Sequence, residues 1–82
     1  MMTRAVQRKC LRRLGDRVTS LRVLRGMTQE EVARKADITR TSLVNLEAGR
    51  NFVSLYMLHG LCVALRVDAG QLLSGILDDK AE

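Results

Sequence analysis

Four residues that favour the N-cap of a helix divide this chain into short segments: Thr28, Thr39, Ser54 and Asp68. The signal at Thr28 is the strongest, because Glu31 follows three positions later and completes a capping box. In that motif each of the two side chains bonds the other residue's backbone N–H. A chain punctuated in this way is expected to fold into several short helices.

The caps and the spacing of apolar residues predict five helices. The first ends near Arg25, the next two cover about 29–36 and 40–48, and the last two begin after Ser54 and Asp68. Few β-branched or aromatic residues are present, which argues against a sheet. The predicted fold class is therefore all-α. We expect the inner side of the fourth helix to hold Leu55, Leu58, Leu61, Cys62 and Leu65. The fifth is expected to carry Leu72, Leu73, Ile76 and Leu77.

The length of 82 residues fits one domain. We interpret residues 13–77 as that domain and residues 78–82 as a polar tail. Residues 1–12 form either a basic N-terminal arm or an extension of the first helix. Gly15 leaves this choice open, because glycine weakens the continuity of a helix.

Positive charge is concentrated in the first third of the chain. Residues 1–26 carry eight Lys or Arg against Asp16 alone, a net charge of +7. Residues 27–82 carry six Lys or Arg against eight Asp or Glu, a net charge of −2. A basic segment on a near-neutral body favours a polyanionic partner, with nucleic acid ahead of an anionic membrane. The alternative is a solvated basic helix face.

Several other functions find no support in the sequence. No apolar run approaches the ~18 residues of a membrane span, and no apolar signal-peptide core follows the basic N-terminus. Cys10 and Cys62 share no metal or redox spacing, so we expect reduced thiols in a cytoplasmic protein that has no metal or other cofactor. Because no phosphate loop or catalytic-serine motif occurs, we do not expect an enzyme.

Only Asp37 and Ile38 separate the second predicted helix from the cap of the third. So short a turn makes two helices cross steeply, as in a helix-turn-helix. On a helical wheel, Leu43 and Leu46 form an apolar face of the third helix. The opposite face carries Arg40, Thr41, Val44 and Asn45.

These four side chains suit base edges in a major groove. Arginine can bond guanine O6 and N7, asparagine can bond adenine N6 and N7, and Thr41 or Val44 can contact a thymine methyl group. The alternative is an ordinary amphipathic helix with a polar outside. Val44 favours the first interpretation, because an isopropyl group facing water does not stabilise a monomer.

Phosphate contacts can be predicted separately. The N-terminus of the second helix offers free backbone N–H groups and partial positive charge, and Gln29 adds an amide donor there. Arg50 and Asn51 follow the third helix, where the chain would next meet the DNA backbone. Such contacts fix the register of a protein on DNA without reading its sequence.

Three segments together resemble a known family. They are Thr28-Gln-Glu-Glu-Val-Ala33, the stretch from Ile38 to Arg50 that ends in Leu-Glu-Ala-Gly-Arg, and residues 54–68. They are similar to the phage Cro and repressor type of helix-turn-helix, also called the xenobiotic-response-element family. The resemblance covers about residues 12–77. It implies a compact five-helix, lambda-repressor-like DNA-binding domain with the helix-turn-helix at the second and third helices.

The resemblance also implies roles for individual residues. Arg22 would form an ion pair with Glu47 and tie the first helix to the third. Two departures are Asp37, where the family usually has glycine, and Val53, where proline is common. The implied phosphate contacts are Gln29 and Arg50, and the implied base-reading positions are Arg40, Thr41 and Asn45, with Ser42 at the boundary between base and phosphate.

The sequence therefore predicts a stand-alone, sequence-specific transcriptional regulator, similar to a phage repressor or a restriction–modification controller. Its partner would be double-stranded DNA, bound as a homodimer, and no residues remain for a small-molecule effector domain. Leu73, Ile76 and Leu77 are a candidate dimer surface, or else they pack within their own chain. The alternative function is an antitoxin or protein-interaction module that represses its own promoter with a partner protein. A membrane-surface protein is disfavoured, because residues 4–13 lack any aromatic anchor.

Overall fold

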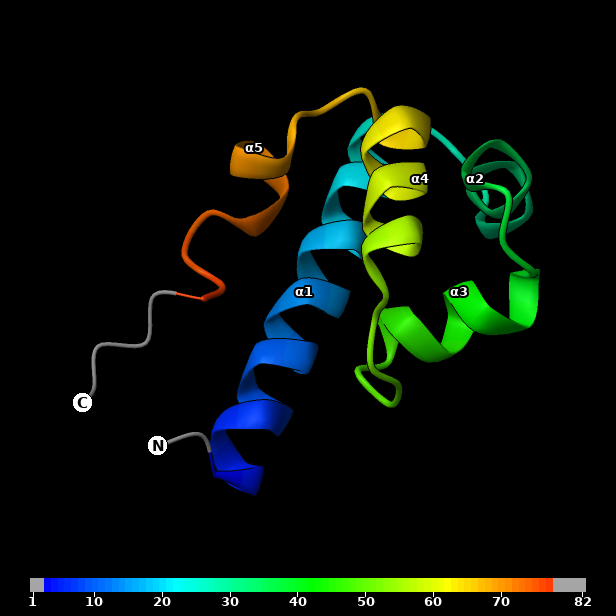
Figure 1. The fold of residues 1–82 in the computed structure, drawn as a ribbon. Helices are drawn as coiled ribbons and strands as arrows, with labels where there is room; N and C mark the ends of the chain where they lie inside the picture. The colour runs from blue at the N-terminus through cyan, green and yellow to red at the C-terminus, as the bar shows by residue number, and fades with distance from the viewer. Residues whose placement is uncertain (1–2, 78–82) are drawn as a thin grey trace.

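The computed structural model describes residues 3–77, which contain five α-helices and no strand (Figure 1). This arrangement confirms the predicted all-α class. The helices are α1 (Arg4–Leu24), α2 (Gln29–Ala36), α3 (Arg40–Glu47), α4 (Leu55–Leu65) and α5 (Ala69–Leu73). The predicted tail, residues 78–82, lies outside the described residues.

The caps read from the sequence determine where the helices begin. In the capping box of α2, the Glu31 N–H donates to Thr28 Oγ1 at 3.0 Å and the Thr28 N–H donates to Glu31 Oε1 at 2.8 Å. The second of these bonds, from the Thr28 backbone N–H, lowers the pKa of the Glu31 carboxyl group because it stabilises the carboxylate. Thr39, Ser54 and Asp68 cap α3, α4 and α5 in the same way, each accepting from a backbone N–H three residues later. These four helix starts are therefore local features that the sequence alone predicts.

The basic N-terminal segment is part of the first helix and not a loose arm. It is continuous from Arg4 to Leu24, and the Thr3 side chain accepts from the Val6 N–H at its start. Residues 4–12 are thus the first turns of α1. Gly15 lies buried in the middle of this helix and does not interrupt it.

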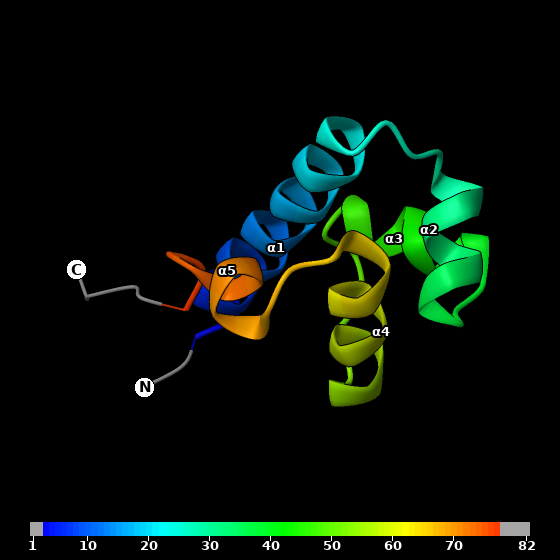
Figure 2. The same ribbon diagram turned by 90° about the horizontal axis from the view of Figure 1, so that it is seen from above.

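The five helices enclose one core to which every helix contributes. In Figure 2, α1 and α5 lie together on one side and α2 lies on the other, with α3 and α4 between them. Leu43, Leu61, Leu65 and Leu72 have no exposed surface. The remaining buried apolar residues are Leu14, Val18, Val32, Ala33, Ala36, Leu46, Ala64 and Ile76.

Two expectations about the C-terminal helices were wrong in detail. Leu55 was placed on the inner side of α4 but is 83% exposed, because it occupies the first position of the helix and points away from the core. The fifth helix ends at Leu73 instead of continuing to Leu77, and Gly75 then turns the chain with φ of 77°. That turn returns Ile76 to the core and leaves Leu77 exposed.

The described residues lack two kinds of feature. Within residues 3–77, no helix is both long enough and apolar enough to cross a membrane. The same residues bring together no group of three or more His, Cys, Asp or Glu side chains that could hold a metal ion.

Candidate nucleic-acid interface

The turn between α2 and α3 depends on Asp37. This residue adopts the left-handed conformation, with φ of 60° and ψ of 44°, and so replaces the glycine usual in the family. Its carboxylate accepts a hydrogen bond from the Tyr56 hydroxyl on α4. The bond raises the pKa of Tyr56, because it stabilises the neutral phenol and the negative charge of Asp37 opposes ionisation. The turn is thus anchored to the helix behind it.

Two glycines allow α1 and α4 to approach the helix-turn-helix at backbone distance. A Cβ atom at Gly15 would lie 2.5 Å from the Glu47 carbonyl oxygen at the end of α3. A Cβ atom at Gly60 would lie 2.2 Å from the Ala36 carbonyl oxygen at the end of α2. Because no larger side chain fits either place, these contacts fix the positions of α2 and α3 on the rest of the molecule.

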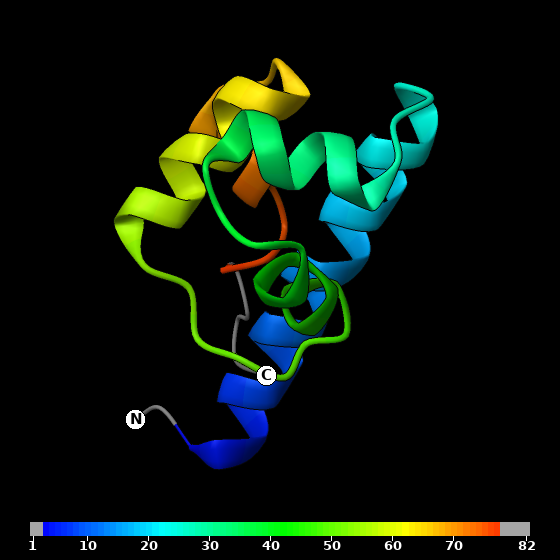
Figure 3. The same cartoon turned by 90° about the vertical axis from the view of Figure 1, so that its right-hand side faces the viewer.

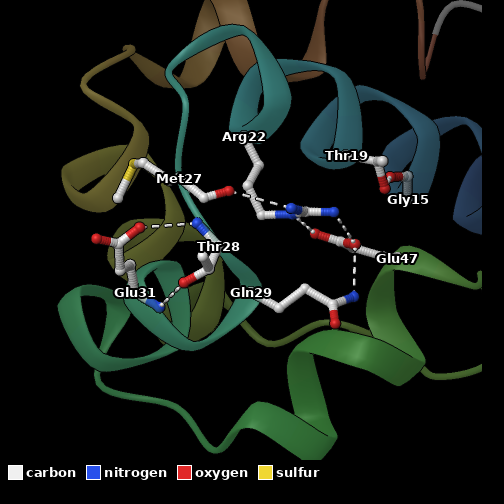
Figure 4. Close-up of polar contacts among 8 residues, drawn as sticks. All are labelled: Gly15, Thr19, Arg22, Met27, Thr28, Gln29, Glu31 and Glu47. Carbon is white, nitrogen blue, oxygen red and sulfur yellow. Dashed lines mark hydrogen bonds and ion pairs between the residues drawn. The ribbon is translucent and has the colours of Figure 1, made fainter.

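A polar network ties the first three helices together (Figure 4). The guanidinium of Arg22 donates to both carboxylate oxygens of Glu47, at 2.8 and 3.2 Å, and this two-bond geometry gives the pair a defined orientation. The ion pair implied by the family resemblance is therefore confirmed. Gln29 Nε2 donates to Glu47 Oε1 at 3.0 Å, and Arg22 also donates to the Met27 carbonyl oxygen at 3.1 Å.

The outer face of α3 is at the surface of the molecule. Figure 1 shows α2 on one side of α3 and leaves the opposite side uncovered. Leu43 and Leu46 are buried, as the helical wheel predicted, whereas Arg40 and Thr41 are exposed. The other residues predicted to contact bases, Ser42, Val44 and Asn45, are half-buried on the same short helix.

Two side chains on α3 already have partners within the chain. Arg50 Nη1 donates to Asn45 Oδ1 at 3.0 Å, and Thr39 Oγ1 donates to Ser42 Oγ at 2.9 Å. A two-bond contact to adenine needs both the oxygen and the nitrogen of an asparagine amide. Asn45 must therefore release Arg50, or share its oxygen with it, when it reads a base.

The predicted phosphate contacts lie at the two ends of this unit. Gln29 is the first residue of α2; its side-chain amide donates one N–H to Glu47 and keeps a second N–H for another acceptor. Arg50 and Asn51 are exposed in the loop after α3, which Gly49 begins with φ of 72°. A hollow lies beside the α2 end, lined by Arg22, Thr28, Gln29, Glu30 and Arg40.

One arginine of α1 and the arginine that directly follows this helix have structural roles that the charge pattern did not reveal. Arg17 donates to the carbonyl oxygens of Gln71 at 2.7 Å and Ser74 at 2.8 Å, and Arg25 donates to the Leu65 carbonyl oxygen at 2.7 Å. These carbonyl groups lie at or just after the C-terminal ends of α5 and α4, where helical partners run out. No local signal in the sequence distinguishes these two arginines from their neighbours.

Comparison with known proteins agrees with this geometry. Residues 13–74 match the helix-turn-helix domain family. The structure is similar to the restriction–modification controller protein C.AhdI from Aeromonas hydrophila, with 31% identity and a TM-score of 0.74 over 76% of this chain and 94% of the controller. It is also similar to the clp gene regulator ClgR from Corynebacterium glutamicum, with 31% identity and a TM-score of 0.71 over 82% of this chain and 83% of ClgR.

A third structure, the wild-type controller C.Esp1396I, shares the fold at 23% identity and a TM-score of 0.72, over 78% of this chain and 83% of that protein. No curated protein sequence matches the chain. The chain belongs to the helix-turn-helix family of DNA-binding transcriptional regulators.

Proposed function

We propose that this protein binds operator DNA as a homodimer and lays α3 of each subunit in the major groove. The observation that carries the proposal is the two-sided character of α3. Leu43 and Leu46 hold the helix on the core, while Arg40 and Thr41 are exposed on the uncovered side. The network of Arg22, Glu47 and Gln29 holds α3 from behind, so its outer face is rigidly positioned before DNA arrives.

The proposed role of each side chain in DNA binding follows from its position. Arg40, Thr41 and Asn45 read base edges, Val44 contacts a thymine methyl group, and Ser42 lies at the boundary between base and phosphate. Phosphate contacts come from the α2 end at Gln29 and from Arg50 and Asn51 after α3.

Two recognition helices related by a two-fold axis would enter successive major grooves about 34 Å apart. We propose a dimer surface at the C-terminal side of the molecule, although Ile76 cannot contribute because it is 3% exposed in its own subunit. A groove lined in part by Phe52, Leu58, Leu73 and Leu77 lies there. Phe52 and Leu77 are 72% and 66% exposed and line the same groove, so a second subunit could cover both.

The similarity to a restriction–modification controller suggests a regulator of restriction–modification genes, acting in the cytoplasm through its own concentration. The exposed apolar residues Leu55 and Val63 on α4 favour a second candidate, a repressor that also binds a partner protein. In that case a partner would bind without DNA and would protect α4 from hydrogen exchange.

Selection of bound duplexes from random DNA tests the proposal. We expect a two-fold symmetric site whose half-sites are about one helical turn apart. A lack of enrichment for any sequence would contradict it.

Sedimentation tests the dimer separately. Phe52→Lys with Leu77→Lys should give monomers that bind DNA weakly. Val23→Lys, at a residue 63% exposed at the far end of α1, is the matched control and should leave the dimer intact. If both variants sediment like the unmodified protein, the proposed surface is wrong.

A further inference from the structure

The first turns of α1 carry a set of cations that the helix-turn-helix does not explain. Residues 4–13 contain five Lys or Arg and no acidic residue. Arg4, Arg8 and Arg12 are exposed, whereas Arg17 and Arg22 in the second half of α1 bond to other parts of the chain. Arg25, directly after α1, bonds to the Leu65 carbonyl oxygen. The arginines of α1 therefore include exposed residues near its start and residues bonded within the chain near its end.

The exposed cations destabilise the helix that carries them. Arg4, Arg8 and Arg12 follow one another at four-residue spacing, which places like charges side by side on a helix surface. Arg4 also lies in the first turn of α1, where the helix dipole disfavours positive charge, and that turn has no acidic residue to offset it. An external anion placed on this row would offset the repulsion.

The row lies on the side of α1 that faces α3. Steps of three and four residues place Arg4, Arg8 and Arg12 on one helix face with Gly15 and Arg22. Gly15 and Arg22 both contact the end of α3, at the Glu47 backbone and side chain. The backbone of Arg12 lies beside Gly49, whose Cβ would be 3.1 Å from the Arg12 Cα atom.

Helix α1 extends toward its N-terminus beyond the contact between Arg12 and Gly49. From Arg12 to Arg4 it extends by about 12 Å at 1.5 Å per residue. Figures 1 and 3 both show these turns extending beyond α3 and the loop that follows it. That loop holds Arg50 and Asn51, the proposed phosphate contacts, so the row prolongs the same basic track beyond the end of α3.

We infer that α1 is a second DNA-binding element, in which Arg4 and Arg8 contact phosphates that flank the groove entered by α3. The inference rests on the proposed function, because the same duplex must occupy both surfaces. These contacts add affinity and salt dependence but no base preference, since phosphates are alike in every sequence. A membrane surface fits less well, because the turns present charged residues with no aromatic anchor.

The test compares two variants that lose the same charge. One carries Arg4→Gln and Arg8→Gln. The control carries Lys35→Gln and Arg66→Gln, at exposed positions on α2 and after α4. Binding to the selected operator and to unrelated duplex is measured from 50 to 200 mM salt, and circular dichroism checks that both variants retain their helix content.

Each lost phosphate contact lowers the slope of log affinity against log salt by about 0.9. We expect the slope of the Arg4/Arg8 variant to be smaller by about 1.8 on both DNAs. Between 50 and 200 mM salt, its affinity should therefore fall by a factor about ten times smaller than that of the unmodified protein. Its ratio of specific to unrelated affinity should stay the same, and the control should keep the original slope.

Two results would overturn the inference. If the Arg4/Arg8 variant and the control have the same slope while the unmodified protein still prefers its operator, α1 does not contact DNA and the proposed function stands. If the unmodified protein shows no preference for any duplex, the proposed function fails and this inference fails with it.

Discussion

Both halves of α1 are rich in arginine, but their arginines have different roles. Arg17 and Arg22 in the second half, and Arg25 directly after it, each bond to an acceptor elsewhere in the chain. In the first half, Arg4 and Arg8 are exposed on turns that extend beyond α3. Net charge alone therefore overstates the surface available to a polyanion, because three of the basic side chains are already committed to holding the fold.

The same comparison explains how the recognition helix is supported. The second half of α1 contacts α3 through a backbone approach at Gly15 and through the ion pair of Arg22 with Glu47. The first half adds no such contact beyond the approach of Arg12 to Gly49. Substitutions in the second half should thus affect stability, and substitutions in the first half should affect DNA binding.

The largest effect is expected at Gly15. Gly15→Ala places a methyl group 2.5 Å from the Glu47 carbonyl oxygen, so α1 and α3 must separate. We expect a loss of about 3 kcal/mol in the free energy of unfolding, measured by urea denaturation. Gly70→Ala is the control, because its methyl group would meet only the Asp68 side chain at 3.2 Å. Equal stability of the two variants would contradict the close approach.

Arg22→Ala should be the next most damaging change. The substitution leaves the Glu47 carboxylate, whose side chain is 7% exposed, without its charged partner. The expected loss is about 2 kcal/mol, since an unpaired acceptor retains its desolvation cost. Arg22→Lys restores the charge but not the two-bond geometry and should recover only part of the stability. Full recovery in the lysine variant would show that geometry does not matter.

Arg17→Ala and Arg8→Ala compare the two halves directly. Arg17 donates to carbonyl oxygens at the end of α5, so its loss should cost about 1 kcal/mol and loosen the α5 region first. Arg8→Ala should change stability by no more than about 0.5 kcal/mol. Thermal unfolding and amide exchange of α5 measure both effects. If Arg8→Ala destabilises as much as Arg17→Ala, the division of α1 is wrong.

The smallest expected effect concerns Tyr56, the only tyrosine in a chain without tryptophan. Its hydrogen bond to Asp37 raises its pKa above the ordinary value, and an ultraviolet pH titration measures this cleanly. Asp37→Asn should lower that pKa, whereas the Arg4/Arg8 variant should leave it unchanged.

The sign of the pH effect follows from the direction of this shift. Because the folded-state pKa is raised, the stabilisation is complete below the ordinary pKa of tyrosine. It is lost as the pH rises through the folded-state value. An unshifted pKa in the unmodified protein would rule out the bond.

Features that depend on residues close together in the sequence were predictable, whereas contacts between distant segments were not. Caps such as Thr28 and Ser54 were predictable because their hydrogen bonds reach only three residues along the chain. The approach of Gly15 to Glu47 was not, because it joins segments far apart in sequence, and glycine alone indicated a weak point in the helix. The length of α5 was overestimated because the spacing of Leu73, Ile76 and Leu77 suggests a continued helix, whereas Gly75 turns the chain soon after Leu73.

The same limit applies to the candidate interface. The helical wheel of α3 correctly predicted that Leu43 is buried and that Arg40 is exposed. It could not show that Gln29 bonds to Glu47 or that Arg50 bonds to Asn45, because both contacts depend on how neighbouring segments fold around α3. The roles of these side chains toward DNA remain predictions.

The placement of α3 in the major groove is tested most directly by Arg40→Ala. Its affinity is measured on the selected operator and on duplexes that carry every single base-pair change within a half-site. We expect a loss of about 1 to 3 kcal/mol that disappears when one particular base pair per half-site is changed. A loss of the same size on every duplex would show that Arg40 contacts phosphate and that the outer face of α3 does not read bases in this way.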